Sequence, residues 1–521
     1  MKTIKLALVA LVFSSHAAFA GGFLTNTNQS VLFLRNPARD AAIGIDGVYT
    51  NPAGVAFMAD GWHLSFNWQN AHQTRTINSA YGPLFALNTK NPAALDAEGL
   101  AWREFKGVAD APFLPSLQAA YNKNRWSFQF NVAVSGGGGK CEFENGLGSF
   151  EGVVASMVPR LNDQLASAVP GVTPFSGYNL NSYMKGQQYY FGATLGAAYK
   201  VTENLSVYGG VRFLYGTANY QGYVKDINLV GPYTLNNDVP AHTIFGELKN
   251  RAATGAQQAA AGAAAAAQAG NADLAAYYQG LATGYAATAQ QMGAYEIVTQ
   301  GINLDCDQSG FGIAPIVGVD YKLGRLNLAA KFDFKVRMRL KNSNPAEGFN
   351  VIAQAVPQLA KYADGNVVAE DSPALFTFGA QYELTDKWRV MAGYHHFFDV
   401  DTKQWTKDLI DDTNEFNVGT EYDITDWLQV SGGLQKTNYD MEEDFMNDIS
   451  FNVSSYTFGL GFGVKVADNV KINAAYFQTN YDTYKKTEQV SANMTSSATL
   501  TVKNNFTRTN RVFGVGVEWD F

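Results

Sequence analysis

The most persistent pattern along this chain is an alternation of large apolar residues with small or polar ones. In 456–466, Tyr, Phe, Leu and Val take every second position, and Thr, Gly and Lys take the positions between them. The same period recurs in 126–134, 189–199, 205–215, 311–321, 326–340 and 416–424. A period of two with one apolar face predicts β-strands.

The connections between these strands are of two kinds. Short polar turns occur at 122–125, 202–204, 322–325, 385–387, 425–426 and 467–469. Long segments lie between them, at 73–111, 135–187, 221–308, 342–372, 399–413, 441–449 and 483–507. Short turns at one end and long loops at the other are typical of an outer-membrane barrel whose short turns face the periplasm. The pattern predicts an all-β fold, a transmembrane antiparallel β-barrel of 14 strands over 62–521; a secreted β-sandwich is the alternative.

Composition and the N-terminus favour an exported membrane protein. Residues 1–20 carry Lys2 and Lys5, an apolar run and an Ala-Phe-Ala end, which is typical of a cleaved signal peptide. No later window holds eighteen apolar residues, so we expect strands rather than helices to span the membrane. The net charge of −8 argues against nucleic acid as a partner. We therefore expect a bacterial outer-membrane location.

Residues 21–61 differ from the rest of the chain. They are rich in Gly, Asn and Ala, show no sustained period and contain the Asn-Pro-Ala triplet twice. The second triplet, Asn51-Pro52-Ala53, comes shortly before the first strand. Because this segment is too short to bury a core of its own, we expect it to lie in the barrel lumen as a plug.

Three of the long loops have helical or low-complexity sequence. They are 151–169, which Pro159 interrupts, the Ala-rich stretch 252–292, and the short apolar stretch 351–362. Alanine favours helix, so we expect helical insertions. Their apolar residues either pack on one another or form a groove for a hydrophobic ligand. Cys141 and Cys306 predict one disulfide between two outer loops in an exported protein, with two free thiols as the alternative.

Several charged residues are predicted to face the lumen. Alternation over 326–340 puts Lys331, Lys335, Arg337 and Arg339 on the face opposite the apolar one, and Arg212 occupies such a position on an earlier strand. A charge facing lipid at mid-membrane costs about 2–4 kcal/mol, which favours the lumen. Either these cations form an ion-pair network that holds the plug, or one of them binds a carboxylate headgroup.

The sequence offers no arrangement for catalysis. His395 and His396 are adjacent, so on a strand they point to opposite faces and cannot easily share a metal ion. No Gly-x-Ser-x-Gly elbow occurs. We expect no enzyme activity, no metal site and no cofactor.

Taken together, the plug-like start, Asn51-Pro52-Ala53 before the first strand, the fourteen strands, the helical outer loops and the terminal Phe521 resemble the FadL-type long-chain fatty-acid transporters of the bacterial outer membrane, a family that includes transporters of aromatic hydrocarbons. The resemblance implies a barrel closed by an N-terminal hatch. It also implies passive uptake of hydrophobic molecules, and a barrel assembled by the barrel-assembly machinery that works as a monomer among outer-membrane lipids.

The same resemblance implies a route for the ligand. The ligand is caught between the outer loops, near 244–292 and 351–362, enters the lumen and leaves sideways where the third strand is kinked. The matching stretch here is Ser135-Gly136-Gly137-Gly138-Gly139, where glycine leaves no side chain to block a gap. A shift of the plug N-terminus, at Gly21, Phe23 and Leu24, would open this route. The alternatives are a surface adhesin, uptake of other amphiphiles, and an open porin.

Overall fold

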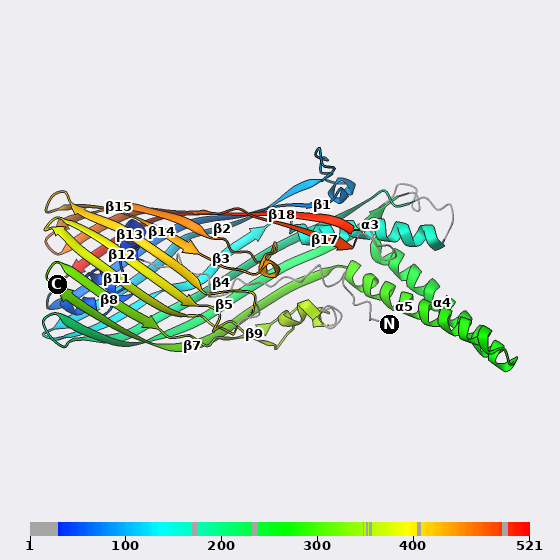
Figure 1. The fold of residues 1–521 in the computed structure, drawn as a ribbon, viewed down its shortest axis with the longest axis horizontal. Coiled ribbons are helices and arrows are strands. Elements are labelled where there is room, and N and C mark those ends of the chain that lie inside the picture. Colours follow the sequence, from blue (N-terminus) through cyan, green and yellow to red (C-terminus); the bar gives the residue numbers. More distant parts are fainter. Residues whose placement is uncertain are drawn as a thin grey trace.

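The structure is a computed structural model that describes residues 30–168, 174–231, 238–346, 348–350, 353, 357–403, 408–491 and 499–521. The predicted signal peptide and the plug residues Gly21, Phe23 and Leu24 lie outside the described residues. Within them the strands form one closed antiparallel barrel, because β1 pairs with both β2 and β18 (Figure 1).

The barrel has the predicted fourteen strands, although they are divided into eighteen segments. Segments β8 and β9, β10 and β11, and β16 and β17 are each two parts of one barrel strand, and β6 is a short addition to β5. The segments are β1 Gly61–Tyr81, β2 Trp102–Lys123, β3 Trp126–Phe143, β4 Gly177–Lys200, β5 Leu205–Val230, β6 Asp238–Pro240, β7 Ile302–Leu323, β8 Leu326–Asp333, β9 Arg339–Ser343, β10 Val367–Ala369, β11 Ala374–Thr385, β12 Trp388–Phe398, β13 Thr413–Asp423, β14 Leu428–Asn438, β15 Ser455–Ala467, β16 Val470–Tyr481, β17 Tyr484–Ser491 and β18 Thr499–Asp520.

The alternation predicted from the sequence decides which face of each strand meets lipid. On β15 the large residues Tyr456, Leu460 and Phe462 are exposed on the outer wall, whereas Gly459 and Thr457 face inward and are buried. An apolar outer face and a small or polar inner face are what a membrane barrel requires.

Several strands continue well past the ends that the sequence predicted. β1, β2, β4, β5, β7 and β18 have 21 to 26 residues, whereas β11 to β16 have 11 to 13. The barrel is therefore taller on one side (Figure 1). The prediction assigned 73–81 and 102–111 to a loop and was wrong there, since strands outside the membrane lose the apolar outer face that marks them in the sequence.

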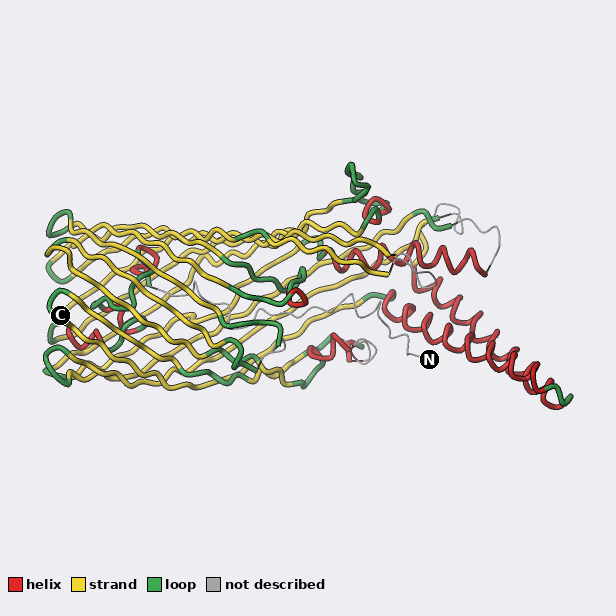
Figure 2. The backbone as a smooth tube through the Cα atoms, viewed as in Figure 1, coloured by secondary structure: helices red, strands yellow, loops and turns green. Residues whose placement is uncertain are grey.

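The long helices lie at the long-loop end. At the opposite end, Figure 2 shows tight turns between the strands and short helical turns inside the barrel. The α-helices are α2 Val31–Arg35, α3 Gly148–Ala168, α4 Ala241–Gln268 and α5 Ala272–Thr299. The short 3₁₀ helices are η2 Ile45–Val48, η3 Gly54–Phe57, η4 Leu84–Leu87, η6 Pro357–Tyr362 and η7 Glu443–Phe445. α3 and the α4–α5 pair confirm the helical insertions expected in two of the loops.

The described part of the N-terminal segment, residues 30–60, lies inside the barrel near the short-turn end (Figures 1 and 2); we call it the lumenal segment. A row of directly paired glycines, Gly419, Gly433 and Gly459, lets its backbone touch the wall. A Cβ added at Gly459 would lie 2.2 Å from the carbonyl oxygen of Leu34. The wall is therefore shaped to receive this part of the chain.

Candidate functional site

A cavity of about 100 Å³ lies in the lumen above the lumenal segment. The segment contributes Phe33, Asp40, Tyr49 and Thr50, and the remaining lining comes from strands on several sides of the barrel. Its apolar part consists of Phe33, Leu214, Phe334, Val336, Pro373, Leu375 and Phe397, and its charged part of Asp40, Arg212, Lys331, Asp333 and His395. We call this cavity the lumenal chamber.

Two of the predicted lumenal cations meet in this chamber. Arg212 and Lys331 each form an ion pair of 2.9 Å with Asp333. The Lys331 ammonium also donates to the backbone carbonyl oxygen of Tyr49, and the Arg212 guanidinium lies 5.1 Å from the centre of the Tyr49 ring. Two cations share one carboxylate here, so this cluster carries one excess positive charge. Through Tyr49, the same cluster attaches the lumenal segment to β5 and β8.

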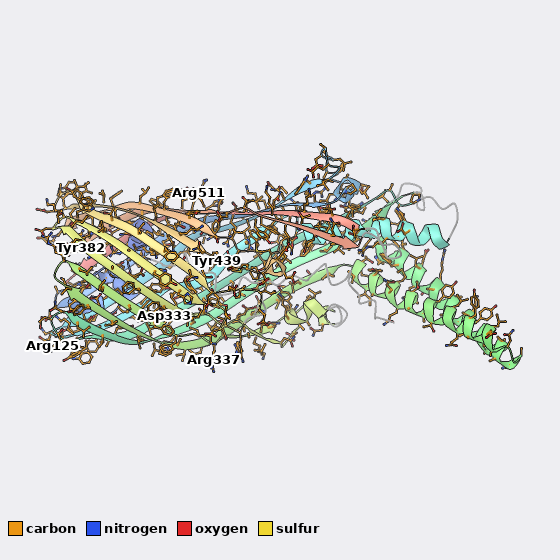
Figure 3. All side chains as sticks on the ribbon, viewed as in Figure 1. Arg125, Asp333, Arg337, Tyr382, Tyr439 and Arg511 are labelled. Atoms are coloured by element: carbon orange, nitrogen blue, oxygen red, sulfur yellow. The ribbon has the colours of Figure 1, made fainter. Side chains whose placement is uncertain are left out.

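The other three predicted cations do not face the lumen. Beyond Asp333 the alternation changes phase, so that Val336, Met338 and Leu340 are buried inside, whereas Arg337 and Arg339 are exposed. Lys335 donates to the backbone carbonyl oxygen of Asp401 rather than to a lumenal group. Figure 3 shows Arg337 at the outer edge of the barrel. The assignment of Lys335, Arg337 and Arg339 to the lumen was wrong.

The phase changes opposite a proline on the neighbouring strand. The β7–β8 ladder ends at Ile316 and Asp333, and the next backbone bond runs from Phe334 to the carbonyl oxygen of Pro315. Because Pro315 has no N–H to donate, the regular ladder cannot continue there. A one-residue change of register moves every following side chain to the other face.

Buried ion pairs hold the lumenal segment to the wall on the opposite side. Arg39 pairs with Asp46 at 2.7 Å and with Glu421 on β13 at 2.6 Å. His395 on β12 lies between Asp40, at 2.9 Å, and Glu415, at 2.8 Å. Arg35 donates to Ser431, Gln429 and Asn473. These contacts correspond to the network alternative weighed for the lumenal charges, although most of the residues involved were not selected from the sequence.

Asn51-Pro52-Ala53 lies low in the barrel and touches three strands. The Asn51 amide donates to Asp320 on β7 at 2.6 Å. The backbone carbonyl oxygens of Pro52 and Ala53 accept hydrogen bonds from Gln129 on β3, at 2.7 Å, and Ser206 on β5, at 2.6 Å. The triplet contacts β3 near its start, so it does not face the glycine run 135–139.

The glycine run coincides with an interruption in the barrel wall. The β2–β3 ladder runs from the pair Lys123–Trp126 to the pair Ser116–Ala133. After a gap it resumes only at the pair Val108–Glu142. The β3–β4 register also shifts on either side of Gly136. Gly137 has a φ of 108°, and a Cβ there would lie 2.1 Å from the carbonyl oxygen of Gln188. Only glycine fits this bend, in which β3 approaches β4 and leaves β2.

A second cavity, of about 60 Å³, lies at this interruption, and we call it the wall pocket. Gly137 and Gly139 line it from β3, and Ala109 and Leu114 from β2. Ser135, at the start of the glycine run, lines the lumenal chamber instead. Ser135–Gly139 therefore reaches from one cavity to the other. The sequence analysis overlooked Pro112 and Pro115 on β2, which have no N–H for the ladder and mark the same interruption.

The predicted disulfide is absent, since both thiols are free and buried. The strand ladders pair Cys141 with Gly186, Gly186 with Tyr220, and Tyr220 with Cys306. Three strand spacings put the two cysteines roughly 14 Å apart, whereas a disulfide needs Cα atoms within about 7 Å. The sequence analysis placed both cysteines in loops, where such a distance could not be foreseen.

The helical loops pack on one another and cover the long-loop end. Phe245 on α4 and Tyr295 on α5 are buried, with ring centres 5.1 Å apart, in the same cluster as Phe150 and Met157 of α3. This is the packing alternative considered for the loops. Of the predicted groove at 351–362, residues 351, 352 and 354–356 lie outside the described residues.

Two buried ionisable groups lie beneath this cover, beyond the membrane-spanning part of the barrel. Burial raises the pKa of Glu370 to about 8, which the Lys361 ammonium partly offsets. Burial lowers the pKa of Lys361 to about 7, which the Glu370 carboxylate partly offsets. Both shifts have the sign that desolvation of a charged group produces.

The described residues contain neither a membrane-spanning helix nor a group of metal ligands. Their helices include none with the length and apolar character needed to cross a membrane. No three His, Cys, Asp or Glu side chains among them are grouped to hold a metal ion.

The fold and its wall define a β-barrel protein of the bacterial outer membrane. A family model described as "Outer membrane protein beta-barrel domain" matches residues 343–521. Among solved structures, the chain is similar to a FadL homologue of Pseudomonas aeruginosa, with 14% identity, 96% of this chain and 100% of that chain covered, and a TM-score of 0.57. That likeness shows a shared fold.

Two further solved structures are similar at lower TM-scores. The toluene transporter TodX of P. putida is 13% identical over 92% of this chain and 94% of that chain, with a TM-score of 0.48. The toluene transporter TbuX of Ralstonia pickettii is 14% identical over 93% and 98%, with a TM-score of 0.47. The search of curated proteins gave no match.

Proposed function

We propose that this protein is a passive transporter of the FadL type, which takes up hydrophobic or amphipathic molecules and releases them sideways through the barrel wall. The observation that carries the proposal is the placement of the lumenal chamber and the wall pocket on either side of the glycine run, with Ser135 in one and Gly137 and Gly139 in the other. The transport that we propose is diffusion and involves no catalytic step.

The lumenal segment acts as the plug in this proposal. Phe33 of α2 lines the lumenal chamber, and its neighbours Val31 and Leu34 pack in one cluster with Ala71 and Val512, which line the wall pocket. A small displacement of α2 would join the two cavities. The ion pairs of Arg39 and His395 keep the rest of the segment in place.

The cluster of Arg212, Lys331 and Asp333 in the chamber favours a ligand with a carboxylate, such as a long-chain fatty acid. Arg212 and Lys331 share Asp333, and the excess positive charge can pair with one further anion. The apolar lining suits the acyl chain. Neutral aromatic hydrocarbons are the alternative, since Phe33, Phe334 and Phe397 also line the chamber.

Uptake of labelled oleate and of labelled toluene, by cells that lack this protein and by the same cells with it restored, tests the proposal. We expect restoration to increase uptake of oleate. Lys331→Met removes the excess charge and should reduce uptake of oleate but not of toluene. Restoration without any gain for either compound would contradict the transport proposal, and a gain for toluene alone would contradict the fatty-acid assignment.

A matched pair of substitutions tests the sideways route. Gly139 has a φ of 67° and no atom within 4 Å of an added Cβ, and Gly324 in the β7–β8 turn has a φ of 59° and the same open surroundings. Gly139→His fills the wall pocket, whereas Gly324→His introduces the same side chain in a similar backbone conformation at the short-turn end. We expect only Gly139→His to slow uptake. Equal uptake by the two variants would exclude release at this position.

A second function, as a surface interaction protein, is favoured by one observation. The α4–α5 pair extends beyond the barrel (Figure 1), and Leu274, Tyr277 and Tyr285 of α5 are exposed along it. Deletion of 252–292 would distinguish the functions. Loss of adhesion to host cells or other surfaces with uptake intact would favour the interaction function, and loss of uptake alone would favour the transporter.

A further inference from the structure

A row of basic residues lies on the outer wall of the barrel where the alternation changes phase. Its members are Lys335, Arg337, Arg339 and Lys341, which occupy every second position. Arg337, Arg339 and Lys341 are exposed, whereas the residues between them are buried in the lumen. The proline that changes the phase thus turns these cations away from the lumen and toward the surroundings of the barrel.

The register of β7 gives the height of this row. Lys341 of β9 lies opposite Ser309 of β7. Just below Ser309, the outer face of β7 carries an apolar series that begins at Phe311, 57% exposed, and ends at Tyr321, 43% exposed. Ten residues on a strand tilted by about 45° span roughly 23 Å, close to the ~25 Å apolar band of such barrels. Lys341 therefore lies at the outer edge of that band, where lipid headgroups are. Arg339 and Arg337 lie two and four residues below it along the strand, and their long side chains can extend toward that edge.

Aromatic side chains lie below the row, on the same barrel strand and on β12. The rings of Phe332 and Phe334 are 4.8 Å apart, and those of Phe332 and Phe398 are 5.8 Å apart. Phe334, which also lines the lumenal chamber, comes directly before Lys335.

Two of the four cations have partners in the protein, and the other two have none among the described residues. Arg339 pairs with Asp371 at 2.6 Å, and Lys335 donates to the carbonyl oxygen of Asp401 at 2.6 Å. In the described part of the chain, no ion pair or side-chain hydrogen bond is recorded for Arg337 or Lys341. The outward carboxylates nearest on β7 accept hydrogen bonds from their own neighbours, Asp305 from Gln221 and Asp307 from Asn219.

We propose that this row binds the phosphate groups of a phosphorylated glycolipid in the outer leaflet of the membrane. Its upper end lies at headgroup height beside an exposed apolar wall, which selects an anion that is attached to acyl chains. Arginine presents a planar donor fork that fits phosphate, and lysine adds a point charge. The site is unconnected with the transported ligand, so it requires only the outer-membrane location.

Binding of lipid A with both phosphates to the purified full chain in detergent, followed by native mass spectrometry, tests the proposal. The double variant Arg337→Gln/Lys341→Gln removes the two cations that have no partner in the described part of the chain. We expect affinity to fall about fivefold for each cation, so roughly 25-fold in total. Lipid A without phosphates should bind weakly to the native chain, with an affinity similar to that of the variant for phosphorylated lipid A. Inorganic phosphate at millimolar concentration should not displace phosphorylated lipid A from the native chain.

A matched control removes the same charge at the other end of the barrel. Lys322 and Lys387 are exposed near the short turns, and Lys322→Gln/Lys387→Gln should leave lipid binding unchanged. Equal affinity of the native chain and the Arg337/Lys341 variant would overturn the proposal. So would an equal loss in the control variant, displacement of the lipid by inorganic phosphate, or equal binding of the phosphate-free lipid.

Discussion

Replacing Gly459 by alanine should displace the lumenal segment while leaving the barrel intact. A Cβ at this position would lie 2.2 Å from the carbonyl oxygen of Leu34, and separations below 3.0 Å are essentially never seen for real Cβ atoms. The segment must therefore move by at least about 0.8 Å, since the obstacle is its own backbone rather than a flexible side chain. Overpacking of this kind costs about 1–3 kcal/mol, which corresponds to a roughly 5- to 150-fold weaker docking of the segment.

Hydrogen exchange of the amides in α2, Val31–Arg35, measures this displacement. We expect the protection of these amides to fall in proportion to the weaker docking of the lumenal segment. We also expect the variant to conduct ions in a planar bilayer more often than the native protein. Heat-modifiable migration in gels should be unchanged, because β15 keeps its outer face and its ladder. The matched control is Gly432→Ala, one strand away, where the nearest atom to an added Cβ is a carbonyl oxygen at 3.5 Å.

The reasoning would be refuted by either of two results. One is native protection of the α2 amides in Gly459→Ala, which would mean that the wall yields and the segment does not. The other is an equal loss of protection in Gly432→Ala, which would mean that any methyl group added to these strands disturbs the barrel as a whole.

Three further predictions concern the lumen, the cysteines and the outer loops. Arg39→Met removes a shared partner from two buried carboxylates, Asp46 and Glu421, and should destabilise the protein by about 3–5 kcal/mol in thermal or denaturant unfolding. An exposed control, Arg125→Met, should change stability by less than about 1 kcal/mol. Mass spectrometry after alkylation under denaturing, non-reducing conditions should show that both thiols, Cys141 and Cys306, are modified. A chain with no modified thiol would mean that the two cysteines form a disulfide. Because the pKa of Glu370 is raised to about 8, its stabilising contribution is complete below pH 4.5 and is lost as pH rises toward 8. The hydrogen-exchange protection factors of the outer loops, which are corrected for the intrinsic effect of pH, should decrease between pH 5 and 7, and Glu370→Gln should remove much of that decrease.

Residue patterns were sufficient where the membrane itself imposes the rule. The lipid requires an apolar outer face on every spanning strand, and Tyr456, Leu460 and Phe462 record that requirement directly in the sequence. The number of strands could therefore be predicted from the sequence, and so could the lumenal location of Arg212 and Lys331. The helices α3, α4 and α5 could be foreseen from local composition, because alanine favours helix without help from distant contacts.

What the pattern could not decide depends on contacts between strands. Whether Arg337 faces lumen or membrane is determined by Pro315 on the neighbouring strand, which interrupts the ladder and changes the phase. The distance between Cys141 and Cys306 depends on two intervening strands, so spacing along the chain does not reveal it. The opening beside Gly137 likewise needs two strands to separate. Alternation along the chain is enough to predict a fourteen-stranded membrane barrel, because each strand meets lipid independently. The lumenal chamber, the wall pocket and the outward basic row cannot be predicted in this way, because each arises where the register between neighbouring strands breaks.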